Sequence, residues 1–211
     1  MIISAFTEES FGVNSYILEE GNHAVLIDPI VTNALKSKLD GIKLDGAILT
    51  HEHVDHILGV NVLKKQFGTK VLCGQKAAKS LLDPSRNMSR YQEFIVKVLP
   101  FGSGTISNED YICKADETLA DGQSFQWQGH EILIKETPGH SAGSIAILVD
   151  WQYLFSGDTV FKNYPTATRL PGGSSKAFAR ITEPWLDSLP QELTVYPGHT
   201  EPFPLKERYR S

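Results

Sequence analysis

The sequence contains few cysteines, no long apolar run and no excess of positive charge. Its two cysteines, Cys73 and Cys113, cannot form the disulfide framework of a small secreted protein, so a cytoplasmic location is expected. The longest apolar runs, such as Ile145–Val149, are far shorter than the ~20 residues of a membrane span. Residues 1–6 lack the basic start of a signal peptide. A formal net charge of −5 provides no basic field, so neither nucleic acid nor a membrane is an expected partner.

The composition is that of an ordinary globular protein. Hydrophobic residues make up 41% of the chain and charged residues 21%, which excludes a disordered, collagen-like or coiled-coil protein. The length of 211 residues fits one domain with a sizeable core, so residues 1–211 are interpreted as a single domain.

Short β-rich runs alternate with helical stretches in the first 82 residues. Strands are predicted at 14–18, 24–28, 46–50 and 70–73, and helices at 33–39, 57–67 and 75–82. The segment 83–121 mixes Pro, Ser, Gly and charges, and is interpreted as either a lid or an insertion.

The chain from residue 124 onward is rich in β-strand patterns. Strands are predicted at 124–127, 131–137, 144–149, 152–155 and 194–196, and a helix at 174–186 with Ser174 as its cap. Each half of the chain therefore combines strands with flanking helices. This pattern predicts an α/β (α+β) fold in which two sheets pack face to face with the helices outside.

Histidine is the residue type that is unevenly distributed. The chain has seven histidines, and three of them lie in Thr50-His51-Glu52-His53-Val54-Asp55-His56, directly after the predicted strand 46–50. In extended backbone His51 and His53 point to the same side. If a helix follows, His53 and His56 again share a side. Four side chains able to bind a metal, one of them Asp55, can therefore converge.

Three later segments each place one similar side chain just after a predicted strand and beside a glycine. They are Thr137-Pro138-Gly139-His140, Ser156-Gly157-Asp158-Thr159 and Tyr196-Pro197-Gly198-His199. Glycine lets the backbone approach a site closely. Each segment alone is a weak signal, but four such segments in one chain indicate a shared site.

The set His-x-His-x-Asp-His followed by His, Asp and His resembles the metallo-β-lactamase superfamily, and within it the glyoxalase II-like hydrolases. The resemblance implies a four-layer αβ/βα sandwich with the site at one edge between the sheets. It also implies the ligands of two metal ions: His51, His53 and His140 for the first, Asp55, His56 and His199 for the second, and Asp158 as the bridge.

Imidazole and carboxylate ligands suit two divalent ions, with Zn²⁺ expected first and Fe or Mn also compatible. The expected reaction is hydrolysis of a small-molecule thioester, either an S-acylglutathione or another acyl-thiol, by a metal-bridging hydroxide, with Asp55 as a catalytic residue. Neither cysteine falls at a ligand position, which disfavours the β-lactamases of the superfamily that place a Cys at the second metal ion. His53 stands where diiron flavoprotein reductases have Glu, which disfavours that branch.

Three alternatives to thioester hydrolysis remain open at this point. A mononuclear iron persulfide dioxygenase would use only His51, His140 and Asp158. A lactone hydrolase would use the same hydroxide as the leading hypothesis. A binding or scaffold protein without activity is disfavoured, because no ligand position is lost.

A serine hydrolase is also considered, because residues 139–143 match Gly-x-Ser-x-Gly and Ser141, Asp158 and His199 follow the chain order of that triad. That motif requires a helix after the serine, whereas residues 144–149 have the pattern of a strand. Ser141 is therefore interpreted as a turn residue beside a metal ligand.

The substrate contacts are the least determined part of the site. Arg169 stands where relatives often have Asp, and it could bind an anionic group. Tyr164 and Arg90 are the other candidate substrate-binding residues. Asp28 is expected to support a metal ligand by a hydrogen bond. His23 and His130 are predicted in turns without a role.

Overall fold

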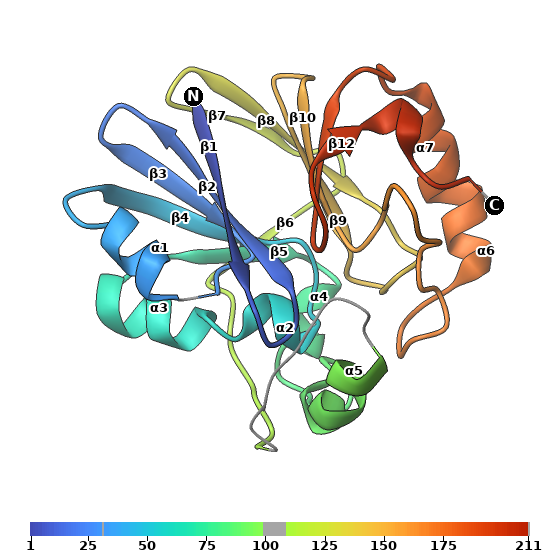
Figure 1. Cartoon of the computed structure of the whole chain (residues 1–211), viewed down its shortest axis with the longest axis horizontal. Coiled ribbons are helices and arrows are strands. Elements are labelled where there is room, and N and C mark those ends of the chain that lie inside the picture. The colour runs from blue at the N-terminus through green and yellow to red at the C-terminus, as the bar shows by residue number, and fades with distance from the viewer. Residues whose placement is uncertain (31, 99–108, 211) are drawn as a thin grey trace.

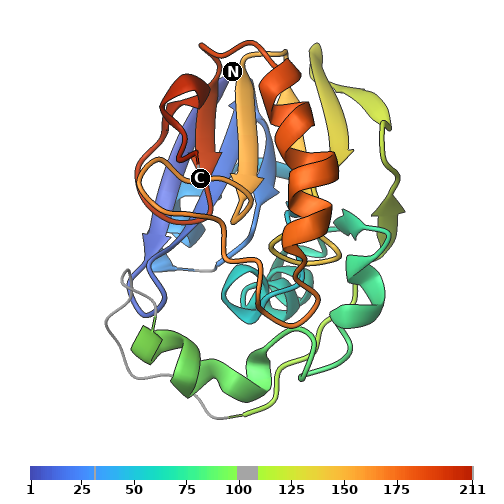
Figure 2. The same ribbon diagram turned by 90° about the vertical axis from the view of Figure 1, so that its right-hand side faces the viewer.

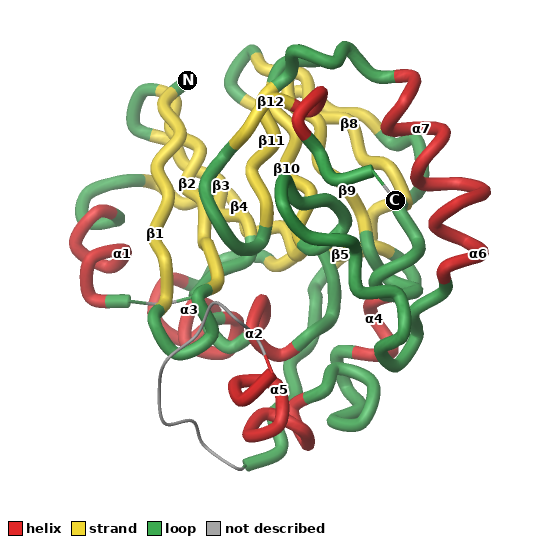
Figure 3. Tube along the Cα trace, turned by 45° about the vertical axis from the view of Figure 1, so that its right-hand side comes forward, coloured by secondary structure: helices red, strands yellow, loops and turns green. Residues whose placement is uncertain are grey.

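Two six-stranded sheets pack face to face in this protein, with helices on the outer sides (Figure 1). The computed structural model describes residues 1–30, 32–98 and 109–210. The layers run helix, sheet, sheet, helix, which confirms the predicted four-layer sandwich (Figure 3).

The first sheet contains the strands of the N-terminal part of the chain in sequential order. Its strands are β1 (Ile2–Glu8), β2 (Val13–Glu20), β3 (His23–Ile27), β4 (Lys43–Leu49), β5 (Val71–Gly74) and β6 (Glu117–Leu119). The first three strands pair antiparallel, and β3 to β6 pair parallel. Parallel strands direct their carboxyl ends to one edge, where sites in layered proteins collect.

The second sheet contains the remaining strands, again in sequential order. They are β7 (Ser124–Trp127), β8 (His130–Glu136), β9 (Ile145–Val149), β10 (Tyr153–Gly157), β11 (Thr194–Pro197) and β12 (Phe203–Pro204). Only β10 and β11 pair parallel. The strand β1 at the edge of the first sheet, and the short strands β6 and β12, were not predicted.

Helices cover the outer face of each sheet. Those on the first sheet are α1 (Asn33–Lys38), α2 (Val54–Ile57), α3 (Val60–Phe67) and α4 (Ala77–Ser80), and those on the second are α6 (Ser175–Ala177), the π-helical turn Phe178–Thr182 and α7 (Glu183–Ser188). Figure 2 shows α6, the π-helical turn and α7 as one continuous helical segment across the outer face of the second sheet. The helix α5 (Gln92–Val98) lies beyond the ends of the strands.

The alternation of side chains along the strands builds three apolar layers. In β2, Ile17 faces the outer helices, whereas Leu18 faces the other sheet. In β9, Ile147 packs between the sheets and Leu148 packs under the helices of the second sheet. Both faces of β9 are therefore buried, which explains why its sequence is apolar at every position.

The predicted helix 57–67 is wrong as a single element. The chain forms two helices instead, with the last bond of α2 from Leu58 N to Val54 O at 3.1 Å and the first of α3 from Leu63 N to Gly59 O at 2.8 Å. Glycine is a weak helix former and permits the break at Gly59. Within the predicted helix 75–82, the α-helix α4 spans four residues, Ala77–Ser80.

The helix predicted at 174–186 is confirmed in position but not in regularity. Ser174 is its N-cap, and the Ser174 hydroxyl accepts a hydrogen bond from Ala177 N at 3.1 Å. The π-helical turn directly precedes α7, whose first turn contains Pro184. Proline has no N–H to donate to the preceding turn, which explains the irregular hydrogen bonding there.

The segment 83–121 belongs in part to the first sheet. Its last part includes β6, which pairs with β5. Its earlier part contains a 3₁₀ turn, Ser89–Tyr91, and α5, and buries Met88 and Ile95 in a cluster with Phe11 and Val54. Residues 99–108 lie outside the described part of the chain, and whether the segment acts as a lid is untested.

Candidate metal centre

The seven predicted ligands come from loops that follow strands of both sheets. The strand β4 leads into His51 and His53, and α2 carries Asp55 and His56. The connection between β8 and β9 contains His140. Asp158 directly follows β10, and His199 comes two residues after the end of β11. Residues far apart in the sequence therefore meet at one end of the sandwich.

The structure brings these seven side chains into two adjacent groups. In each group the potential ligand atoms all lie within 4.8 Å of one another, and every member is buried. The first group is His51, His53 and His140, and the second is Asp55, His56, Asp158 and His199. This division matches the expected two sets, with Asp158 in the second group and its Oδ2 3.6 Å from His140 Nε2 of the first.

Two buried polar atoms of these groups have no hydrogen-bond partner within the described part of the chain. They are the Nε2 atoms of His51 and His53, while His56 Nε2 and Asp158 Oδ1 lie 3.3 Å from each other as an ion pair. A buried polar atom without a partner costs about 1–3 kcal/mol, and proteins rarely tolerate several at one place. Imidazole nitrogen and carboxylate oxygen are also the donors that divalent transition metals prefer, so these residues fit a metal centre.

The second ring nitrogen of most of these histidines is held by the protein. His140 Nδ1 donates to Ala167 O at 3.1 Å, and His199 Nδ1 donates to Gly12 O at 2.9 Å. A carbonyl oxygen can only accept, so in both rings Nδ1 carries a hydrogen and Nε2 is the nitrogen left to face the centre. His51 Nδ1 lies 3.1 Å from Thr50 Oγ1.

His53 presents the other ring nitrogen to its neighbour. Its Nδ1 lies 2.8 Å from His140 Nε2, so one ring nitrogen of each of these two predicted metal ligands lies within hydrogen-bond distance of the other. The rings of His51 and His140 are also close, with centroids 4.8 Å apart. Three imidazoles crowded in this way have a common position that each can ligate.

Asp28 supports the centre from behind, as the sequence indicated. Its Oδ2 accepts hydrogen bonds from Thr50 Oγ1 at 2.6 Å and from His56 Nδ1 at 2.8 Å, and its Oδ1 accepts one from Thr50 N at 2.7 Å. The backbone of Asp28 is left-handed, with φ of 49°. The aspartate therefore fixes the ring of His56 and, through Thr50, the ring of His51.

The electrostatics of the two groups differ. In the first group, burial lowers the pKa of His53 to about 3 and, together with the neighbouring histidines, holds the pKa of His51 well below its usual value. Burial also lowers the pKa of His140. These imidazoles are neutral near pH 7, which is the form that binds a metal ion.

The second group combines carboxylates with histidines. Burial alone would lower the pKa of His199, but Asp158 and Asp55 raise it to about 10. The same two carboxylates also raise the pKa of His56 against its burial. Burial opposes ionisation of Asp158, yet His199 and His56 hold its pKa well below its usual value. The carboxylates therefore already attract positive charge to this place, and a cation would satisfy them equally well.

Two glycines provide the space in which the ligands meet. A Cβ on Gly198 would collide with Asp158 Oδ1 and with the ring of His56, and one on Gly157 would collide with Thr50 Oγ1. The sequence indicated that these glycines let the backbone approach the site closely. In the structure the groups that lie against them are the side chains of Asp158, His56 and Thr50.

The candidate substrate contacts lie outside both groups. Arg90 is exposed, and its guanidinium pairs with Asp110 at 2.8 Å. Tyr164 and Arg169 are exposed in the loop that also carries Ala167, the acceptor for His140. Contact of these three residues with a substrate stays a prediction.

The remaining histidines and the cysteines lie elsewhere. His23 and His130 begin β3 and β8, so their prediction in turns is wrong, and they pair with Asp45 at 2.7 Å and Asp150 at 2.6 Å. Both cysteines are buried, as expected for small apolar residues.

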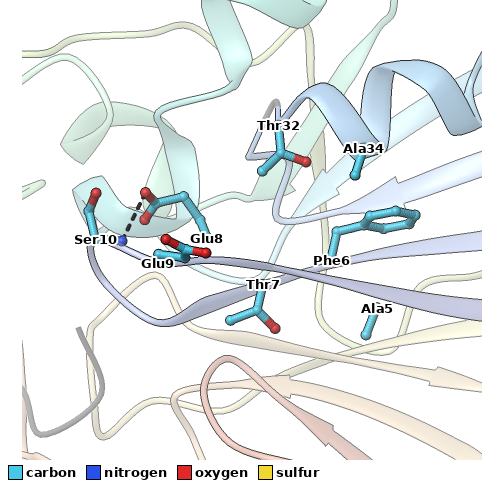
Figure 4. Close-up of a pocket in the computed structure, with 8 residues that line it drawn as sticks. All are labelled: Ala5, Phe6, Thr7, Glu8, Glu9, Ser10, Thr32 and Ala34. Carbon is cyan, nitrogen blue, oxygen red and sulfur yellow. Dashed lines mark hydrogen bonds between the residues drawn. The ribbon is translucent and has the colours of Figure 1, made fainter. Parts of the chain in front are cut away.

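Two surface pockets of the described chain contain none of the seven residues. One, of about 590 Å³, lies along β1 and the start of α1, where Figure 4 shows Phe6 beside Ala34 and the Glu8 carboxylate bound to Ser10 N. The other, of about 280 Å³, is lined by Thr166 and Thr168 on either side of Ala167, and by Phe178 of the π-helical turn.

Sequence comparison decides the family. The model of the Metallo-beta-lactamase superfamily matches residues 10–199 of this chain. The chain belongs to this superfamily. It is a metallo-hydrolase of that family by fold and by the two candidate metal-binding groups.

Individual relatives are distant but cover most of the chain. An uncharacterized protein of Mycobacterium tuberculosis is 29% identical, over 94% of this chain and 91% of its own length. A hydroxyacylglutathione hydrolase of Rhizobium etli is also 29% identical, over 90% of this chain but only 62% of the enzyme. The crystal structure of the BLEG-1 B3 metallo-β-lactamase superposes with a TM-score of 0.82 at 26% identity, covering 98% and 95% of the two chains.

No helix within the described residues is both long enough and apolar enough to cross a membrane.

Proposed function

We propose that this protein is a binuclear metal-dependent hydrolase of a small-molecule thioester, similar to glyoxalase II. The observation that carries the proposal is the pair of adjacent buried groups, one of three neutral histidines and one of histidines and carboxylates. The similarity to a hydroxyacylglutathione hydrolase over 90% of the chain supports the thioester as substrate. Zinc is the first expectation for both ions, and the cytoplasm for the location.

The number of buried carboxylates favours two ions over one. Asp28, Asp55 and Asp158 are all buried around the second group. When His56 and His199 are neutral, as metal ligands must be, three carboxylates exceed the charge of a single divalent ion, and buried charge that is not compensated is costly. Two divalent ions would compensate all three.

The residues would hold and orient rather than react covalently. Bound ions would supply Lewis acidity for the thioester carbonyl and lower the pKa of a water molecule. The carbonyls of Gly12 and Ala167, with Asp28, keep the histidine rings in one orientation. Burial opposes ionisation of Asp55, but His56 and His199 lower its pKa, so the carboxylate is ionised and accepts hydrogen bonds. Its Oδ2 lies 3.4 Å from His199 Nε2, and the carboxylate can orient a water.

Ser141 is not placed to act as a nucleophile. Its hydroxyl donates to the Glu52 carboxylate at 2.9 Å, and the segment after it leads into the strand β9 instead of a helix. Replacement Ser141→Ala should therefore leave turnover within about tenfold at saturating metal, whereas a serine hydrolase would lose roughly a millionfold.

The test is metal analysis of the purified protein followed by a substrate panel of thioesters, lactones and persulfides. We expect about two metal ions per chain, thioester hydrolysis, and loss of both after Asp158→Asn. A protein with about one iron per chain that consumes oxygen with a persulfide would instead be a dioxygenase that uses His51, His140 and Asp158. A fully metal-loaded protein that turns over lactones but no thioester would overturn the proposed substrate.

A further inference from the structure

Glu52 is a buried carboxylate beside the first histidine group that is not a member of it. It lies between His51 and His53 in the sequence, and only 2% of its surface is exposed. In the extended backbone that precedes α2, its side chain points to the opposite side from those two histidines. A glutamate at such a place needs hydrogen-bond partners to be tolerated.

The partners of Glu52 belong to the loop that carries His140. Ser141 Oγ donates to Glu52 Oε2 at 2.9 Å, and Ser141 is the residue next to His140. Ser144 Oγ lies 2.9 Å from Ser141 Oγ and accepts a hydrogen bond from Ser141 N at 3.2 Å. The carboxylate is therefore bound to a loop whose own shape is fixed by a second serine.

The loop is built to receive this carboxylate. A Cβ on Gly143 would collide with Glu52 Oε2 and with Ala77 of α4, so only glycine leaves the space that the carboxylate occupies. Burial raises the pKa of Glu52, while hydrogen bonds from Ser141 and from the backbone of Glu52 and Gly143 act in the opposite direction. Among its described contacts these donors, and no cation, satisfy the carboxylate.

The Glu52 contact connects two separate loops without using a ligand atom, unlike the contact between His53 Nδ1 and His140 Nε2. At their base they are joined by the backbone hydrogen bond from Ile145 N to Thr50 O at 2.8 Å. The bond between Glu52 and Ser141 lies further along both loops, directly beside the ligands His51, His53 and His140. These two connections hold the relative position of the loops without using a ligand atom.

We propose that Glu52 is a positioning residue that ties the His51–His53 loop to the His140 loop and so assembles the three-histidine group before a metal ion binds. The inference rests on the proposed function in one respect, that this group binds a metal.

The experiment is titration of the metal-free protein with Zn²⁺ by calorimetry, and with Co²⁺ by visible absorption, for the wild type and for E52A, E52Q, S141A and the double variant E52A/S141A. Supporting outcomes are a first-site affinity about 10–100-fold lower in E52A and an unchanged second site. E52Q should recover part of the affinity, since the amide oxygen of Gln can still accept from Ser141 but its NH₂ group cannot accept from the backbone N–H groups. The double variant should bind no more weakly than E52A, because both substitutions remove the same hydrogen bond.

The matched control is E136Q, since Glu136 is also near the loop but pairs with Lys76 at the surface. Thermal melting of each metal-free variant checks that the fold is retained. Equal binding by E52A and the wild type would overturn the inference alone and leave the proposed function intact. Equal weakening of both sites, or additive effects of E52A and S141A, would show a general structural role and would also overturn it. A wild type that binds no metal would overturn both proposals.

Discussion

Replacement of Asp28 by Asn tests how the protein orients its predicted metal ligands. Asp28 Oδ2 accepts hydrogen bonds from both His56 Nδ1 and Thr50 Oγ1, and Oδ1 accepts one from Thr50 N. An amide has one oxygen and one NH₂ group. If the oxygen keeps the bond to Thr50 N, the NH₂ group faces two donors, and the neutral form of His56, which is the form that binds metal, must carry its hydrogen on Nε2 instead of Nδ1.

The expected effect on metal binding follows from that change of tautomer. A hydrogen on Nε2 of His56 removes the lone pair that faces the second group. Loss of such a supporting partner typically costs 10–100-fold in metal affinity, or about 1.4–2.7 kcal/mol. The backbone is not perturbed, because Asn tolerates the left-handed φ of 49° as well as Asp does. The substitution therefore isolates the hydrogen bonds.

The assay is Zn²⁺ titration of metal-free D28N, with the ring tautomers read from ¹⁵N chemical shifts of the histidines. We expect weaker binding at the second site, a smaller change at the first, and a neutral His56 ring that carries its hydrogen on Nε2 instead of Nδ1. Asp45→Asn is the matched control, because Asp45 accepts from His23 at 2.7 Å and from Trp127 Nε1 at 2.9 Å, outside both groups. Unchanged affinity at the second site in D28N would refute the reasoning.

Three further predictions concern the packing of the centre, the thiols and acid stability. Gly198→Ala should destabilise the metal-free protein by about 1–3 kcal/mol in urea unfolding and reduce its metal content, whereas Gly46→Ala, whose Cβ would meet Leu72 at an ordinary 3.6 Å, should do neither. Burial raises the pKa of Cys73 and Cys113 to about 12, so neither thiol should react with an aromatic disulfide at pH 8 until the chain unfolds; rapid reaction of the native protein would contradict this. Burial opposes ionisation of Asp45, but Trp127 and His23 lower its pKa. Asp45 should therefore stabilise the fold above about pH 4 and lose this contribution as the pH falls. The melting temperature of D45N should accordingly fall less steeply below about pH 4 than that of the wild type.

Local patterns were sufficient for most of the strands. The runs 124–127 and 144–149 correspond within one residue to β7 and β9, because β-branched and aromatic residues bounded by turns are a strong local signal. Helices were predicted less well. The run 57–67 has helical spacing throughout, but it contains the break at Gly59 between α2 and α3, and Phe67 at its end is 38% exposed.

The short strand β6 could not be predicted, since its three residues carry no periodic signal. It forms because Val71 N donates to Asp116 and the neighbouring strand β5 offers a free edge. The same applies to β12, which has only two residues.

The sequence by itself determined which side chains could bind metal, because histidine and aspartate at these spacings have few other uses after a strand. It also indicated Asp28 as a supporting residue. Only the tertiary structure decided how these side chains are oriented. The carbonyls of Gly12 and Ala167 hold two of the rings, and a carbonyl oxygen belongs to every residue, so no sequence pattern marks it. Likewise Glu52 reads as an ordinary charged residue between two histidines. Only the folded chain buries it against Ser141 and Gly143, because a contact between residues about ninety positions apart depends on how the two sheets pack.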